Sequence, residues 1–340
     1  MRFSGVFRLV LASFLFSCAD LPAQQPFQFP TANHALYEIG QELKFFAPTA
    51  PDKPWNTGSF GCVRSDGWQM HEGLDIRCLQ RDRRGEPTDP IMSTADGTVV
   101  YINKRPSLSN YGNYIVIRHL IEGLEIYSLY AHLSAIQPAL RVGQAVKGGE
   151  VIATMGRTSN TGETITQDRA HVHFELNVFV NDNFPAWYKK AFPGERNDHG
   201  MWNGQNLNAL DECEILLAEH SPKGGFSLLN FVRGQTGLCR VLVRATNFPY
   251  LKRYPELVLK NPVADKEGVA GYEIAWNYNA VAFALMPRAA SEIKGRARFQ
   301  LLSVNEAEYA AHHCRRLVVK RVGRWELTDT GLRELELLTY

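Results

Sequence analysis

The sequence predicts an all-β, antiparallel domain over residues 58–182 and a mixed α+β domain over residues 206–340. Between residues 58 and 181, short runs of β-branched and aromatic residues alternate with turn signals. No long stretch of helical periodicity interrupts them, so a parallel sheet with helical crossovers is not expected there. A compact antiparallel sandwich fits this pattern best. After residue 206, strand-like and helix-like patterns are mixed.

The N-terminal 19 residues are typical of an export signal. Arg2 and Arg8 precede an apolar run at residues 9–16. This run is too short to cross a bilayer as a helix. Two cleavage positions are open. Cleavage after Ala19 would release the protein into the periplasm or the medium, whereas cleavage before Cys18 would leave an outer-membrane lipoprotein. We expect membrane contact only through such a lipid anchor.

Length and charge restrict the partners that the chain can be expected to bind. Its 340 residues are enough for two domains, and 45% hydrophobic with 21% charged residues is ordinary for a folded protein. Removing residues 1–19 takes away Arg2 and Arg8 and no acidic residue, so the formal charge falls from +2 to 0. A neutral protein has no electrostatic reason to bind nucleic acid. The oligomeric state is not indicated.

The individual elements follow the order of the chain. Residues 20–57 are rich in Pro, Gln and small polar residues and are expected to form a tether and lead-in segment. Glu122-Gly123 separates two β-rich runs and predicts a hairpin. The strands expected in this domain cover residues 98–102, 114–119, 124–130, 151–155 and 171–180.

The C-terminal part begins after a linker or ordered loop at residues 183–205. A hairpin is predicted through Val322-Gly323, and a closing helix over residues 328–338. The other predictions are strands at 226–232, 240–245 and 296–304 and a helix at 306–315. No catalytic motif is found there, so the role of this part stays open.

Three short motifs carry chemistry, and they are His71-Glu72-Gly73-Leu74-Asp75, Tyr130-Ala131-His132-Leu133 and His171-Val172-His173-Phe174-Glu175. On a strand, residues i and i+2 share a face, so His171 and His173 project together. Zinc takes histidine nitrogen and carboxylate oxygen, and a catalytic zinc site keeps one position open for water. His71, Asp75 and His173 would therefore hold one Zn²⁺.

Two further histidines have no ligand role and are candidate catalytic residues. Zinc lowers the pKa of its bound water from about 15.7 to about 7, and amide hydrolysis also needs a proton acceptor and a group that stabilises the oxyanion. Histidine suits both tasks near neutral pH, so His132 and His171 are the candidates. His119 keeps a minor possibility of a site role. The remaining histidines are expected to be structural or exposed, and they are His34, His199, His220, His312 and His313.

The three motifs in this order resemble lysostaphin- and LytM-type zinc endopeptidases, which cut peptidoglycan peptides. Several segments outside the motifs are also similar to that family, namely Ser59-Phe60-Gly61 with Arg64, 95–99, Tyr111-Gly112-Asn113-Tyr114 and 142–152. The resemblance covers residues 58–180. It implies a small antiparallel β-sandwich with a duplicated hybrid motif and an open groove. It also implies zinc at His71, Asp75 and His173, with His132 and His171 catalytic.

The resemblance implies an exported zinc metalloendopeptidase that cleaves peptidoglycan stem peptides or cross-links by attack of zinc-bound water. An alternative is a non-enzymatic regulator of wall amidases, because some relatives have lost metal ligands. All five site positions are filled here, which argues against it. A third possibility is that the C-terminal region binds the wall or a partner. An insertion at residues 163–169 is expected at the groove edge, and the scissile bond stays open.

Cysteine pairing is open from the sequence. Disulfides are allowed outside the cytoplasm, and Cys62 and Cys78 are the easiest pair to propose because they flank the first motif. Two buried free thiols are the alternative. Of Cys213, Cys239 and Cys314, one must stay unpaired within the chain.

Overall fold

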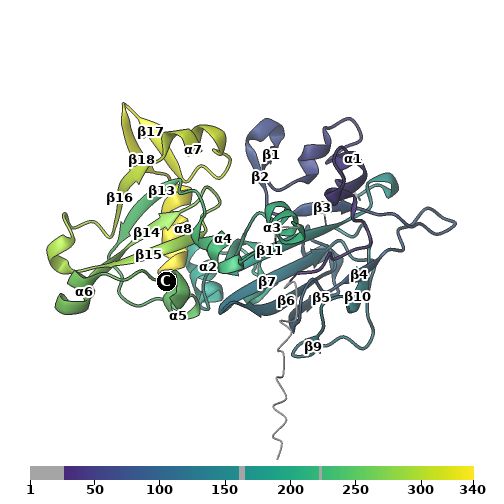
Figure 1. Cartoon of the computed structure of the whole chain (residues 1–340), viewed down its shortest axis with the longest axis horizontal. Coiled ribbons are helices and arrows are strands. Elements are labelled where there is room, and N and C mark those ends of the chain that lie inside the picture. Colours follow the sequence, from purple (N-terminus) through teal and green to yellow (C-terminus); the bar gives the residue numbers. More distant parts are fainter. Residues whose placement is uncertain (1–26, 161–164, 222–223) are drawn as a thin grey trace, which may run out of the picture.

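A computed structural model describes residues 27–160, 165–221 and 224–340 and shows two β-rich parts side by side (Figure 1). Every pairing between the named strands is antiparallel, which confirms the predicted class of the first part. The predicted export signal and Cys18 lie outside the described residues. Within the described ranges, no helix is both long and apolar enough to cross a membrane.

The first part is built on a seven-stranded sheet of order β12-β11-β7-β6-β5-β9, with β3 also paired to β11. Its strands are β3 (Leu74–Arg77), β5 (Gly97–Asn103), β6 (Tyr114–Ile121), β7 (Leu124–Ala131), β9 (Ala145–Val146), β11 (His171–Phe179) and β12 (Leu207–Ala209). Smaller sheets contain β1 (Gly61–Arg64) with β2 (Gln69–His71), and β4 (Pro90–Met92), β10 (Val151–Thr154) and β8 (Ala135–Ile136). The predicted hairpin is β6–β7. Its turn residues Glu122 and Gly123 both have positive φ, at 50° and 85°, as a type I′ turn requires.

The two faces of the large sheet are buried differently. Along β11, Val172 and Phe174 point into the main hydrophobic core and are fully buried, as the alternation predicts. The opposite face carries a smaller aromatic cluster at one end, which includes Tyr114 and Phe179 and packs against Trp202. That cluster covers only part of the face, and the histidines of β11 lie beyond it.

Residues 27–57 pack against the domain, so the expectation of a tether is wrong for this described stretch. Phe27, Phe29, Phe45 and Phe46 are at most 6% exposed and belong to the main core. A short helix, α1 (Glu42–Phe45), carries one of them. Burying aromatic rings is among the largest contributions that a side chain makes to a core, and this outweighs the polar composition of the segment.

The segment 183–205 is ordered and begins with α2 (Phe184–Ala191), which buries Phe184, Trp187 and Tyr188. The strands that follow form a sheet of order β15-β14-β13-β16 and a separate hairpin, β17–β18. They are β13 (Cys239–Val243), β14 (Gly271–Trp276), β15 (Ala282–Arg288), β16 (Phe299–Val304), β17 (Val318–Arg321) and β18 (Arg324–Leu327). The helices are α3 (Glu212–His220), α4 (Leu228–Arg233), α5 (Pro249–Arg253), α6 (Pro262–Glu267), α7 (Glu306–Ala311) and α8 (Asp329–Leu338).

One C-terminal prediction is wrong, because the run 226–232 contains helix α4 instead of a strand. Ser227 accepts a hydrogen bond from the Asn230 backbone N–H at 3.1 Å and caps the helix, and this local signal overrides the β-rich composition. The predicted strands at β13 and β16, the hairpin through Val322-Gly323 and the closing helix α8 are confirmed.

The two parts share one continuous hydrophobic core. Polar contacts also cross between them. Asn208 donates to the Ala280 carbonyl at 2.9 Å, and Asn279 donates to the Ala209 carbonyl at 2.8 Å. Because buried hydrogen bonds of this kind fix relative position, the C-terminal part is packed on the first part along β12.

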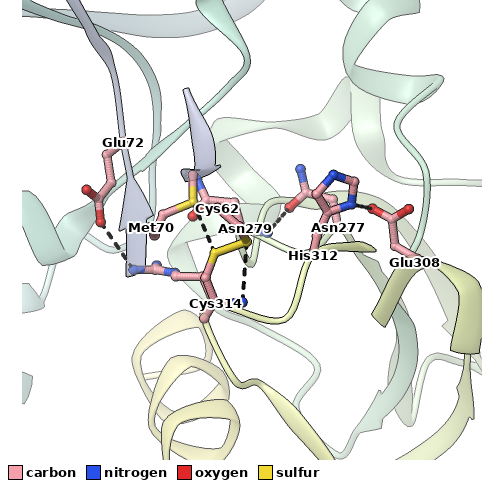
Figure 2. The surroundings of a disulfide bond; sticks show 9 residues. Cys62, Met70, Glu72, Asn277, Asn279, Glu308, His312 and Cys314 are labelled. Atoms are coloured by element: carbon pink, nitrogen blue, oxygen red, sulfur yellow. Dashed lines mark hydrogen bonds and ion pairs between the residues drawn. A yellow bond between two sulfur atoms is a disulfide. The ribbon is translucent and has the colours of Figure 1, made fainter. Parts of the chain in front are cut away.

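The disulfide joins the two parts and differs from the predicted pair. Cys62 in β1 is bonded to Cys314, 252 residues later (Figure 2). Cys78 is a buried free thiol. The proposal of a Cys62–Cys78 bond is therefore wrong. The β1–β2 hairpin turns toward the C-terminal part, whereas Cys78 stays beside β11 and donates its N–H to the Ala170 carbonyl.

Candidate metal centre

The three predicted metal ligands come from neighbouring strands. His71 ends β2, Asp75 lies in β3 and His173 lies in β11. β3 pairs with β11 so that Asp75 stands opposite His173, which brings the two side chains together. Gly73 lets the chain between β2 and β3 run close to β11, since a Cβ there would lie 2.4 Å from the Phe174 carbonyl oxygen. The first motif is therefore extended, and this close approach requires its glycine.

Three potential ligand atoms converge in this centre. Asp75 Oδ1 lies 3.1 Å from His71 Nε2 and 2.9 Å from His173 Nδ1, and the two nitrogens are 3.1 Å apart. The three residues are at most 6% exposed. Among the described residues, these three form a group whose ligand atoms all lie within 4.8 Å of one another. Two imidazole nitrogens and one carboxylate oxygen are a donor set that suits zinc.

Hydrogen bonds fix the orientation of both imidazole rings. His71 Nδ1 donates to the Ser59 carbonyl at 2.7 Å, so its Nε2 lone pair is free to face the centre. His173 donates from Nε2 to Glu175 Oε1 at 2.7 Å, which leaves Nδ1 facing the centre. Histidines that bind a metal usually donate their other ring N–H to an oxygen atom, as both rings do here.

The pKa values of the two histidines predicted to be ligands shift in opposite directions. Burial lowers the pKa of His71 to about 4, against the opposing effect of Asp75. Burial also acts to lower the pKa of His173, but hydrogen bonds to Asp75 and Glu175 raise it to about 9. The lone pairs of His71 Nε2, Asp75 Oδ1 and His173 Nδ1 repel one another at about 3 Å unless a proton or a cation lies between them. The centre therefore favours a positive charge, and the residues fit a divalent metal.

The two predicted catalytic histidines lie beside these ligands. His132 follows β7 with a φ of 61°, and its ring centroid is 4.8 Å from that of His171. Nδ1 of His132 donates to the Thr158 carbonyl at 2.8 Å, and Nδ1 of His171 donates to the Arg169 carbonyl at 2.6 Å. Burial, followed by the neighbouring histidines, holds the pKa of His132 well below its usual range. Burial also lowers the pKa of His171. Both rings are therefore neutral near pH 7 and can accept a proton.

Three residues of the centre received no role from the sequence. Arg64 donates to Asp75 Oδ2 at 2.5 Å, which leaves Oδ1 for the centre. Glu175, 1% exposed, accepts from Tyr111 Oη at 2.7 Å and from Asn177 Nδ2 at 2.9 Å. Burial and the Glu175 carboxylate hold the pKa of Tyr111 well above its usual range, so its hydroxyl stays a donor. Glu175 is the last residue of the third motif, and Tyr111 is the first residue of the Tyr-Gly-Asn-Tyr segment. Their positions in these two segments are the sequence features from which a role could have been predicted.

The centre opens onto a cavity of about 740 Å³. Beyond the five predicted residues, its lining includes Arg64, Glu72, Asn110, Tyr111, Ser159, Ile165, Thr166 and Arg169. Ile165 and Thr166 belong to the predicted insertion, so this part of it lines the groove. Residues 161–164 are outside the description. A second cavity, of about 440 Å³, shares Glu72, Asn110 and Tyr111 with the first and extends the groove.

The first part of the chain is similar to known proteins. Residues 69–184 match Peptidase family M23. The chain is 34% identical over 112 residues to the DD-carboxypeptidase/endopeptidase Mpg of Neisseria meningitidis serogroup B, covering 33% of this chain and 21% of that protein. It is 40% identical over 133 residues to the murein hydrolase activator NlpD of Salmonella dublin, covering 38% of this chain and 29% of that protein.

The chain covers only part of each of these relatives. It spans between 21% and 29% of the length of these two relatives. Among solved structures, the catalytic domain of lysostaphin from Staphylococcus simulans is 24% identical, with 35% of this chain and 74% of that chain covered and a TM-score of 0.25. The family match over residues 69–184 and the order of the three motifs identify a LytM-type peptidase domain.

Proposed function

We propose that the LytM-type peptidase domain makes this chain an exported zinc metalloendopeptidase that hydrolyses peptide bonds in peptidoglycan stem peptides or cross-links. The observation that carries the proposal is the convergence of His71 Nε2, Asp75 Oδ1 and His173 Nδ1 at the floor of a groove. Two neutral histidines lie next to this set, which is the arrangement that metal-assisted hydrolysis needs.

His71, Asp75 and His173 would hold the metal. Zinc, when bound, would supply a water of lowered pKa and would polarise the substrate carbonyl. In His132 and His171 the Nδ1 atom donates to a backbone carbonyl, so Nε2 is the ring nitrogen left to accept a proton. Nε2 of His171 lies 3.5 Å from Asp75 Oδ1. Either ring can take a proton from water and, once protonated, can donate to the oxygen that gains charge. Arg64 holds the second oxygen of Asp75 and so keeps that carboxylate in one orientation.

A second function is supported by one comparison. The relative at 40% identity is named a murein hydrolase activator, so this chain could act on a wall amidase instead of on peptide bonds. The filled positions His71, Asp75, His132, His171 and His173 favour the enzyme. Such a complete set has no evident use in a protein that only activates a partner.

Digestion of purified peptidoglycan separates the two functions. The zinc-reconstituted protein is incubated with defined peptidoglycan types, with and without a wall amidase, and the products are read by mass spectrometry. The enzyme proposal expects new peptide ends without amidase, and the masses then identify the scissile bond. If products appear only when amidase is present, the chain is an activator.

A further inference from the structure

A loop of the C-terminal part is fastened to the hairpin that leads into the metal centre. Cys314 is bonded to Cys62 of β1, and the ring of His313 lies 4.3 Å from that of Trp68 between β1 and β2. The guanidinium of Arg316 lies over the same indole at 5.4 Å. Because β2 ends at His71, this loop is held beside the groove. Figure 2 shows the disulfide between the two segments and Glu72 nearby.

Arg315, the residue after Cys314, lines the second cavity of the groove together with Glu72. Its Nη1 lies 3.8 Å from Glu72 Oε1, and its Nη2 lies 3.5 Å from Glu334 Oε1. Both distances exceed the 2.7–2.9 Å of a strong charge-assisted hydrogen bond. Its Nε is buried and has no hydrogen-bond partner among the described residues.

The other guanidinium of this cavity belongs to Arg196, whose side chain is 78% exposed to solvent. Arg196 forms an ion pair with Asp198 at 2.5 Å. Arg315, by contrast, has a side chain that is only 23% exposed, and its two contacts are long, which leaves N–H donors available on Nη1 and Nη2. A planar guanidinium with unused donors matches the two oxygens of a carboxylate, and a lysine at this place would offer only a point charge.

We infer that Arg315 is a specificity-determining residue of the groove and that its guanidinium binds a carboxylate of the substrate peptide. The inference rests on the proposed peptidase function and deepens it. Glu72 follows the ligand His71 and lines both cavities, whereas Arg315 lines only the second. The bound carboxylate therefore belongs to a residue displaced along the groove from the bond that is cut. The substrate class is a stem peptide with a free carboxylate, on a side chain or at its C-terminus.

The test uses two cross-linked muropeptide dimers that are identical except that the stem-peptide carboxylates of one are amidated. The wild-type holoenzyme is expected to cleave the free-acid dimer with a kcat/KM about tenfold to a hundredfold higher, mainly through KM, as for hydrogen bonds to a charged group. Arg315→Ala should lose this preference while keeping its zinc content and melting temperature. Arg315→Gln serves as a second variant if the alanine protein is unstable. Arg324→Ala removes an exposed positive charge of the same part that lines neither cavity, and it should keep the preference.

Each outcome decides between the alternatives. Loss of the preference in the Arg315 variants but not in Arg324→Ala supports the inference. Equal cleavage of both dimers by the wild type, or an unchanged preference in the Arg315 variants, overturns it and leaves the peptidase function standing. If the wild type cleaves neither dimer, the proposed function fails, and the inference fails with it.

Discussion

His119 and His173 lie in the same sheet, on β6 and β11, and are buried to similar degrees, at 1% and 6% exposure. His119 is held by the Asp96 carbonyl and the Ser128 hydroxyl, and burial lowers its pKa to about 4. For His173, hydrogen bonds to two carboxylates overcome burial and raise the pKa to about 9. Burial alone therefore does not mark a site. The neighbouring carboxylates and the opening onto a groove separate a metal-ligand candidate from a structural histidine.

The largest effect is expected when His173, the predicted metal ligand, is replaced. His173→Ala should lose bound zinc, and cleavage of peptidoglycan should fall at least about a thousandfold, because a catalytic metal contributes several kcal/mol to transition-state stabilisation. Metal analysis and muropeptide release measure the two effects. His220→Ala, an exposed histidine far along the chain, is the control. Retained cleavage by a metal-free His173→Ala protein would contradict the assignment.

The next effect concerns the two histidines without a ligand role. His132→Ala and His171→Ala should each lower kcat by about 10² to 10⁴, the range for loss of a general acid or base, while zinc content stays at the wild-type level. Loss of zinc in either variant would instead make that residue a ligand. Steady-state kinetics with zinc determination on the same sample distinguishes the two.

A smaller effect is expected when Glu175, whose carboxylate accepts a hydrogen bond from His173, is replaced. Glu175→Gln keeps the shape of the side chain but removes the charge that accepts from His173 Nε2. Zinc affinity should fall about tenfold to a hundredfold, as for other outer partners of metal ligands, and Tyr111→Phe should cause a smaller loss. Competition with a chelator measures both. An unchanged affinity in Glu175→Gln would show that this hydrogen bond does not tune the centre.

The smallest effect on function is expected at His119, where only stability should respond. Its folded pKa of about 4 lies below the unfolded value of 6.5, so between these values the unfolded chain binds a proton that the folded protein does not. Stability is therefore lost as pH falls from about 6.5 to about 4, by about 3 kcal/mol from this residue. His119→Gln should remove this component of the pH dependence of unfolding and leave zinc content unchanged. A loss of zinc would give His119 a site role.

The sequence was sufficient for several local features of the fold and for the grouping of His71, Asp75 and His173, whose role as metal ligands stays a prediction. The β6–β7 hairpin follows from its turn residues, and the shared face of His171 and His173 follows from strand periodicity. The sequence could not predict the Cys62–Cys314 disulfide, because a contact between residues 252 positions apart depends on how the two parts pack. For the same reason Arg315 received no role, since its place beside the groove depends on that packing and on no local motif.

The most direct test of the metal centre is a crystal structure of the zinc-loaded protein with anomalous data at the zinc edge. The account predicts one anomalous peak per chain, bonded to His71 Nε2, Asp75 Oδ1 and His173 Nδ1, with Arg64 still on Asp75 Oδ2. Absence of a peak in this position, or a zinc held by other residues, would contradict the account.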